Sequence, residues 1–564
     1  MRSRTAPSLA LAAAVALAIA GCSPSIGGGE ADEEPTPVQG EVSAPAEPTA
    51  VIAATAGPAL AVGASQALFA SAPLAVVADG DDPAAQLRGA SAAVALGVPL
   101  LLDGDDAALT AELERLGTED VLAVGAVELP GGDGESAAED GTADGAPAVV
   151  PAPADDEALA ELLGGSAGEP VAVEEGSEAA AVGALERGEF RALVPVGAAA
   201  QPEPTSTDDD DDAELPPSTP AEPVTDVVVM STGAAADVAA VATARAAGAD
   251  VLVVPGGDPR ASSESVQALA ERAPAHVLAL GDAFGDADTL GWRAATAATG
   301  VELPGGGQLV FPGKRYVALY GTPSTTALGV LGEQDVPATI ERAAEHAAPY
   351  QALTEDTVVP ALEIIATVAS AGAGGDGNYS NELAVESLRP LVDAAGEAGQ
   401  YVVLDLQPGR ASFLEQAQLY SELLALPHVG LALDPEWNLG PDETHMVQIG
   451  SVTSAEINEV VDWLADFTRE NALPQKLLVL HQFQVRMIQH IGEVDLSRTE
   501  LAVLIHADGQ GGQGAKQDTW ATLRASAPGV EWWGWKNFYD EDLPMLSPEE
   551  TMRVQPMPHF VSYQ

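Results

Sequence analysis

Basic residues, aromatic residues and cysteine are all scarce in this chain of 564 residues. A single cysteine rules out any disulfide within the chain. Only 23 Lys and Arg accompany 85 Asp and Glu, and the net charge of −62 would repel a phosphate backbone, so we expect no nucleic-acid partner. Aromatic residues make up 4% of the chain. Apolar residues reach 46%, which is enough for real cores, and the length suggests about three or four domains.

Known cofactor and metal motifs are also missing from the places where they would be expected. The glycine-rich stretch Gly509–Gly514 lacks the Lys-Ser/Thr pair of a phosphate-binding loop. No His-x-His motif occurs on the first predicted strand of the second half, where barrel metallohydrolases typically carry one. We therefore predict no cofactor.

The N-terminus has the pattern of an export signal. Arg2 and Arg4 precede the apolar stretch Leu9–Ala20, which is too short to span a membrane by itself. The following Ile19-Ala20-Gly21-Cys22 resembles the lipobox of bacterial lipoproteins. That resemblance implies that residues 1–22 are a signal peptide and that Cys22 is lipidated, which would anchor the protein to membrane lipid on the extracytoplasmic side, facing the cell wall. An ordinary secretory signal that happens to contain a cysteine is the alternative.

Three low-complexity tracts indicate linkers. Residues 23–49 are rich in Gly, Pro, Glu and Ser, which predicts a disordered tether. Residues 201–223 include five consecutive acids, Asp208–Asp212, which repel one another and predict an acidic, Pro-rich linker. Residues 130–154 are interpreted as a long inserted loop.

Between these tracts lies an internal repeat, with one copy at Leu74–Gly125 and another at Val227–Gly281. Each copy reads as strand, Ala-rich helix, Gly turn, strand, Gly-Asp turn, helix and strand. Val171–Gly197 reads as a partial copy. Strands that alternate with helices of this length predict parallel βαβ units. We therefore predict flavodoxin-like α/β modules over residues 50–200 and 224–306.

The repeats resemble the cell wall-binding repeat 2 family of Gram-positive surface proteins. The resemblance is carried by AVALGVPLLLDGDDAALTAELERLGTEDVLAVG in the first copy and by ARAAGADVLVVPGG with HVLALG in the second. In that family three modules form a compact unit that holds proteins on wall polymers, so cell-wall polysaccharide or peptidoglycan becomes the expected partner. A generic flavodoxin-like domain is the alternative.

Residues 307–564 have a different pattern, in which seven apolar segments alternate with six helical stretches. This arithmetic predicts a (β/α) TIM-type barrel whose eighth strand is absent or lies near Gly307–Phe311. An open doubly wound sheet is the alternative. The predicted strands are Arg315–Gly321, Pro360–Ser370, Tyr401–Pro408, Val429–Trp437, Lys476–Phe483, Leu501–Gly509 and Val530–Tyr539. The predicted helices are Ala338–His346, Leu383–Ala398, Ser412–Leu426, Ala455–Asn471, Gln484–Ile491 and Asp518–Ala527.

Ionisable residues gather where these strands end, which is the functional edge of either fold. Asp434 and Glu436 follow an apolar strand two residues apart, so both side chains can point the same way. Such a pair suits acid/base catalysis. We predict catalytic roles for Asp405, Asp434, Glu436 and Asp508, and substrate-binding roles for Tyr320, Gln407, Trp437, His481, Gln482, His506, Trp535 and Lys536.

Glycoside hydrolysis fits this set, because it needs two carboxyl groups and a surface for sugar rings. The segment ALDPEWNLGP resembles the fourth barrel strand of family 25 lysozymes. That resemblance implies that Glu436 is the proton donor and that Asp434 assists it. The expected function is therefore a barrel that binds or hydrolyses a cell-envelope glycan.

Two alternatives stay open. One is a non-catalytic surface protein that only binds the wall. The other is a metal-dependent hydrolase in which His481, His506 and Asp508 act with Asp434. Histidines and a carboxylate that converge on one point would favour a metal site. Acids neutralised by Arg or by backbone donors would favour a binding protein.

Overall fold

The structure is a computed structural model that describes residues 37–127, 129, 146–197 and 215–564. The predicted signal peptide with Cys22, residues 23–36 of the predicted tether, most of the predicted 130–154 loop and the acid run Asp208–Asp212 lie outside the described residues. Within the described ranges, no helix combines the length and apolar character needed to cross a membrane.

The N-terminal half contains parallel βαβ units, as the repeat predicted. In the first copy, β4 (Leu74–Ala78) is the second strand of a four-stranded sheet with the order β5-β4-β6-β7. The other strands of this sheet are β5 (Leu100–Leu102), β6 (Asp120–Val124) and β7 (Ala148–Pro151), and the helices are α2 (Pro83–Leu96), α3 (Asp106–Leu116) and α4 (Asp156–Leu162). Gly97 and Gly117 end α2 and α3 in the left-handed conformation that glycine adopts without strain.

The second copy forms a matching sheet with the order β11-β10-β12-β2. Its strands are β10 (Val227–Ser231), β11 (Asp250–Val253), β12 (His276–Leu280) and β2 (Thr49–Ile52), with helices α6 (Val238–Ala247), α7 (Ser263–Arg272) and α8 (Ala287–Ala297). The partial copy is real, with β8 (Val171–Val173) and β9 (Leu193–Pro195) parallel around α5 (Glu178–Gly183). Helix α6 packs against α1 (Gly57–Leu68), α2 and α5, so Ala-rich helices join the three units.

Pairing reaches into segments predicted as linkers. Strand β1 (Glu41–Val42) pairs with β3 (Phe69–Ser71), and β2 completes the sheet of the second copy. Val38 N donates to Pro217 O at 2.8 Å, which ties the end of the predicted tether to the predicted acidic linker. Val38, Glu41, Val42 and Thr49 of the predicted tether are therefore paired, which composition cannot show because one partner strand lies more than 200 residues away.

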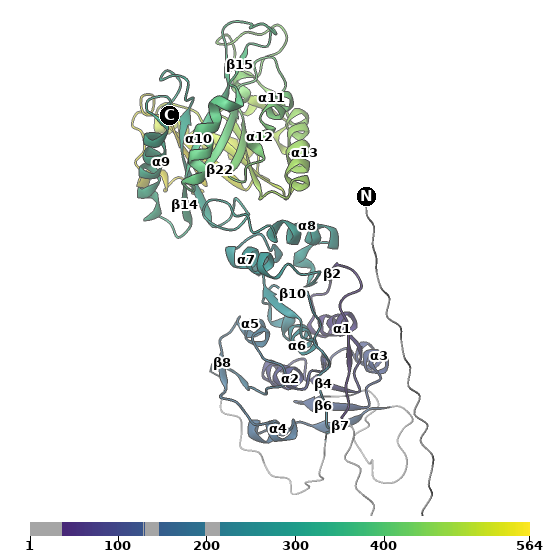
Figure 1. The fold of residues 1–564 in the computed structure, drawn as a ribbon. Helices are drawn as coiled ribbons and strands as arrows, with labels where there is room; N and C mark the ends of the chain where they lie inside the picture. Colours follow the sequence, from purple (N-terminus) through teal and green to yellow (C-terminus); the bar gives the residue numbers. More distant parts are fainter. Residues whose placement is uncertain (1–36, 128, 130–145, 198–214) are drawn as a thin grey trace, which may run out of the picture.

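The C-terminal half is a closed barrel of eight parallel strands (Figure 1). Strand β13 pairs with both β14 and β23, which closes the ring. The strands are β13 (Lys314–Gly321), β14 (Thr357–Ala369), β16 (Tyr401–Leu406), β17 (Val429–Leu433), β19 (Lys476–Gln482), β21 (Leu501–Ala507), β22 (Trp532–Asn537) and β23 (Phe560–Tyr563). The main outer helices are α9 (Val336–Gln351), α10 (Val385–Glu397), α11 (Phe413–Leu419), α12 (Ser421–Leu424), α13 (Ser454–Glu470) and α14 (Gln513–Ser526).

Two barrel predictions were wrong. The eighth strand is β23 at the C-terminus, and Gly307–Phe311 forms no strand. Instead, buried Val310 and Phe311 close the bottom of the barrel, where Phe311 stacks on Trp532 at 4.8 Å between ring centroids. Residues 484–491 do not form the predicted helix: a 3-10 turn (Val485–Met487) leads into strand β20 (Ile488–Gln489), which pairs with β18 (Val452–Thr453). A second 3-10 turn follows at Ile491–Glu493.

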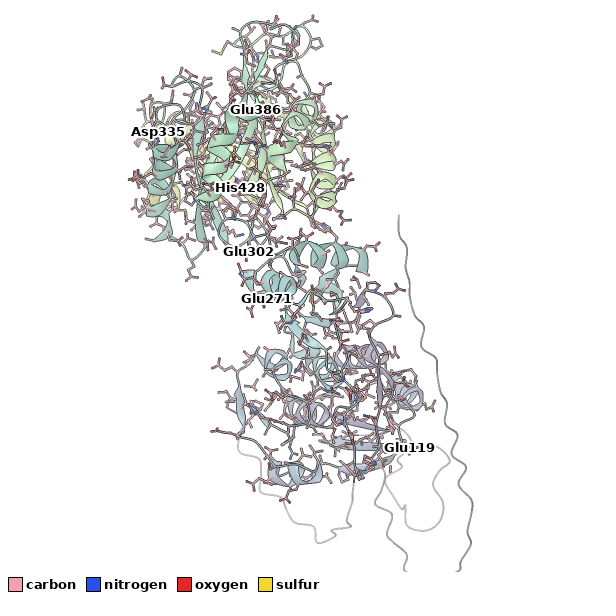
Figure 2. The ribbon with its side chains drawn as sticks, in the orientation of Figure 1. Glu119, Glu271, Glu302, Asp335, Glu386 and His428 are labelled. Atoms are coloured by element: carbon pink, nitrogen blue, oxygen red, sulfur yellow. The ribbon has the colours of Figure 1, made fainter. Side chains whose placement is uncertain are left out.

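The barrel interior is apolar at the bottom and polar at the top. Its lower part is filled by a cluster that includes Tyr316, Tyr401 and Phe560. Figure 2 shows which end faces the modules: His428, just before β17, lies toward Glu302, whereas Glu386 at the start of α10 lies at the opposite end. The carboxyl ends of the strands therefore point away from the N-terminal half.

Two arginines, one from each half, join the second module to the barrel. Arg260 is 1% exposed, pairs with Asp258 and donates to Thr499 O of the barrel at 3.2 Å. Its guanidinium lies 4.4 Å from the ring centroid of Trp292, and Arg469 of α13 lies 4.6 Å from the same ring. The second module is thus attached to the bottom of the barrel.

Candidate functional site

Polar side chains from all eight strands meet at the carboxyl end of the barrel. Alternation along each strand turns these residues inward and their neighbours outward. We call this cluster the barrel-end site. It consists of Tyr320, Glu363, Asp405, Asp434, Glu436, His481, His506, Asp508, Lys536 and Ser562.

His481 lies at the centre of the barrel-end site and is fully buried. Its Nε2 lies 2.9 Å from Glu363 Oε1, and its Nδ1 lies 3.0 Å from Asp508 Oδ2. His506 is its register partner on β21, and the two rings are 5.0 Å apart between centroids. Side-chain atoms of Glu363, His481 and His506 that could bind a metal all lie within 4.8 Å of one another. Two histidines and a carboxylate converge as expected for a metal site, but the carboxylate is Glu363 and not the predicted Asp434 or Asp508.

A second group of contacts in the barrel-end site is centred on Tyr320. Its hydroxyl donates to Asp405 Oδ2 at 2.9 Å, and Gln407 Nε2 donates to the same hydroxyl at 3.4 Å. Lys536 Nζ lies 3.4 Å from the centroid of the Tyr320 ring. Lys536 therefore brings a buried positive charge to a site that is otherwise rich in carboxylates.

The charges of the central groups follow from burial and from their neighbours. Burial alone would lower the pKa of His481, but Glu363 and Asp405 outweigh it and raise that pKa well above its ordinary value. Burial lowers the pKa of His506 to about 3, so this ring is neutral. Burial opposes ionisation of Asp508, but its hydrogen bond to His481 lowers the pKa overall. His481 is thus a cation held by carboxylates.

The other acids of the barrel-end site behave differently. Burial, followed by the charge of Asp405, raises the pKa of Asp434 well above its ordinary value. Burial raises the pKa of Asp405 to about 6. Glu436 is only half-buried, and burial together with the charge of Asp508 raises its pKa to about 7. The site therefore holds protonated carboxyl groups near neutral pH, of which Glu436 is the most accessible.

The local fold explains how Asp434 and Glu436 are held. Strand β17 ends at Leu433, and Pro435–Trp437 forms a single 3-10 turn. Asp434 caps this turn, because its Oδ1 accepts the backbone N–H of Glu436 at 3.1 Å. The predicted strand end is therefore a turn, in which the Asp434 carboxyl group is held by the backbone of Glu436.

Aromatic rings lie next to Glu436. The rings of Trp437 and His445 are 5.4 Å apart between centroids, and His445 Nε2 lies 2.9 Å from Tyr379 O. The guanidinium carbon of Arg410 lies 4.4 Å from the centroid of the Tyr379 ring. The half-buried Trp437 offers a flat face of the kind that sugar rings pack on.

Two predicted binding residues lie apart from the barrel-end site. Gln482 follows inward-facing His481, so it faces the opposite side of the strand, where its Nε2 donates to Val485 O at 3.4 Å. Trp535 is 1% exposed, and its ring centroid lies 5.6 Å from that of Trp520 on α14. Its Nε1 donates to Asn537 Oδ1. Trp535 therefore belongs to the core between barrel and helix.

Sequence reasoning missed Glu363 and Ser562. Glu363 was read as part of an apolar strand, although a lone carboxylate inside PALEIIATVAS is a signal in itself, because an unpaired buried charge is costly. Ser562, whose Oγ lies 3.2 Å from His506 Nε2, was missed together with its strand.

Comparisons with known proteins add little. No protein-family model matches the chain, and no curated protein matches it. Among solved structures, Cwp6 from Clostridium difficile is similar at 13% sequence identity and a TM-score of 0.30. The similarity covers 58% of this chain and 64% of that chain, which is less than two thirds of its length.

Proposed function

We propose that this protein is a lipid-anchored, extracytoplasmic protein whose barrel hydrolyses glycosidic bonds in a cell-envelope polysaccharide. Glu436 is the proton donor to the leaving group, and Asp434 positions it. Trp437 provides a packing surface for a sugar ring. Asp405 and Asp508 shape the charge around this pair, and Lys536 and Tyr320 lie at the base of the same site.

The state of Glu436 carries this proposal. A general acid must hold a proton near the working pH and must reach the substrate. Burial and Asp508 raise the pKa of Glu436 to about 7, while the side chain stays half-buried at the carboxyl end of the barrel. In a TIM-type barrel this end is where catalytic residues gather.

Two features of the N-terminal half support the proposed location. The lipobox-like Ile19-Ala20-Gly21-Cys22 supports anchoring, and the three βαβ units joined by α6 suit the resemblance to wall-binding repeats. The barrel-end site faces away from these units, so a glycan could enter it while the modules hold wall polymer.

Purified chain should be incubated with peptidoglycan and with wall polysaccharide, and new reducing ends should be counted. We expect reducing ends from one of these substrates. Glu436→Gln keeps the shape of the side chain but removes the acid, and its rate should fall about 10²–10⁴-fold. Asp442→Asn is the matched control, because Asp442 is an exposed acid on the loop that follows Glu436, and its rate should stay normal.

The same experiment separates cleavage from binding alone. If the wild type pulls down with a glycan but releases no reducing ends, the barrel is a binding module. If Glu436→Gln and wild type release reducing ends equally, Glu436 is not the proton donor.

A further inference from the structure

The base of the barrel-end site has the chemistry of a metal centre. Glu363, His481 and His506 are each fully buried, and their donor atoms converge. Glu363 Oε1 lies 2.9 Å from His481 Nε2 and 4.0 Å from His506 Nδ1. We propose that these three side chains bind one divalent transition-metal ion of the zinc class. The site goes beyond the proposed glycan hydrolysis and does not depend on it.

The outer contacts of both histidines support this assignment. A histidine that binds a metal through one ring nitrogen usually has the other held by a hydrogen-bonding partner. His481 Nδ1 is held by Asp508 Oδ2 at 3.0 Å, and a bound ion would replace the proton that Nε2 otherwise shares with Glu363. His506 Nε2 is held by Ser562 Oγ at 3.2 Å, which leaves Nδ1 facing Glu363. Asp508 and Ser562 are therefore positioning residues for the two rings.

Unpartnered atoms surround the same point. Glu363 Oε2, His506 Nδ1 and Asp405 Oδ1 are buried and have no hydrogen-bond partner within the described part of the chain. A buried polar atom without a partner costs about 1–3 kcal/mol, so three of them in one place call for an explanation. A cation bound here would give a partner to each of these three side chains. Asp405 Oδ1 lies 3.9 Å from His481 Nε2, close enough to supply a fourth donor.

The donor set selects the kind of ion. Two imidazoles with carboxylates suit zinc and its neighbours in the first transition row, whereas magnesium and calcium prefer oxygen alone. Ligand atoms around tetrahedral zinc stand about 3.4 Å apart. The 2.9 Å and 4.0 Å separations bracket that value, so a small shift of the His506 ring would complete the site.

The test is metal binding by the full chain, independent of any enzymatic activity. Protein dialysed against a chelator should be titrated with Zn²⁺ and, separately, with Co²⁺, at physiological salt to suppress binding to the acidic surface. We expect one tightly bound ion per chain and a Co²⁺ visible spectrum typical of imidazole ligation. Glu363→Gln and His506→Gln should each weaken binding at least tenfold, and Asp508→Asn about tenfold.

His428→Gln is the matched control, since His428 is a partly buried histidine whose Nε2 lies 3.1 Å from Val392 O, at the other end of the barrel. It should bind metal like the wild type. Absence of a tight ion from the wild type would overturn the proposal, as would equal binding by Glu363→Gln and His506→Gln. Should those variants fail to fold, the Co²⁺ spectrum of the wild type still decides, because a spectrum without nitrogen ligands excludes the two histidines.

Discussion

Replacing Glu436 by Gln should lower activity and raise stability at the same time. The glutamine side chain has the same size as glutamate and can form hydrogen bonds, but it cannot ionise. A residue placed for catalysis at the expense of stability gives this opposite pair of changes, whereas a merely structural acid would lose both. The combination therefore tests whether Glu436 is held ready for proton transfer.

The size of the stability change follows from the pKa. The ordinary value is 4.5, and the folded protein raises it to about 7. One pKa unit corresponds to about 1.4 kcal/mol, so ionising Glu436 in the folded state costs at most about 3.5 kcal/mol. Because the side chain is only half-buried, screening by water reduces this, and we expect about 1–2 kcal/mol.

The sign depends on pH. Folded protein holds the Glu436 proton more tightly than unfolded protein does, so the stability that this proton contributes is complete below pH 4.5 and is lost as pH rises through about 7. The Glu436→Gln variant has no ionisable group at this position, so its stability does not fall in this way between pH 4.5 and pH 7. Urea unfolding in the presence of a chelator should show equal stability for the two proteins at pH 4 and greater stability of the variant at pH 8. A variant that is less stable than the wild type at pH 8 would refute the reasoning.

Three further predictions concern buried contacts at the site and elsewhere in the chain. Lys516→Met should cost about 3–5 kcal/mol in urea unfolding, because it leaves Asp542 buried without its cation, and adding Asp542→Asn should recover part of the loss. Gly534→Ala should weaken metal binding in the same titration, since a Cβ there would lie 2.6 Å from His506 Cδ2; unchanged affinity would show that the ring is free to move. Arg260→Ala should split one calorimetric transition into two, because it removes the buried link between module and barrel; a single unchanged transition would contradict this role for Arg260.

The barrel was predictable because its strands carry strong local signals. In runs such as KLLVLHQ and LAVLIHA an apolar stretch is followed by a histidine near the end of the strand. Both the strand and the position of its functional residue could therefore be predicted. Strand β23 was not, because Phe560–Tyr563 is four residues long and becomes a strand only by pairing with β13 and β22. Tertiary pairing decides such short segments.

Site residues at the ends of strands could be predicted from the sequence, whereas site residues inside strands could not. Asp405, His481 and Asp508 were found because polar residues stood out at the end of an apolar run. Glu363 lies in the middle of β14, six residues before its end, and reaches the site because β14 is unusually long. Trp535 and Lys536 are neighbours that face opposite ways, and only the register of β22 separates the core residue from the site residue.

The most direct measurement of the central claim is the rate of glycan cleavage by wild type and Glu436→Gln at pH 6 and pH 8. If Glu436 donates the proton with a pKa of about 7, the wild-type rate should fall about tenfold between these values, because its protonated fraction does, and the slow residual rate of the variant should not follow that curve. A pH profile shared by both proteins would contradict the account.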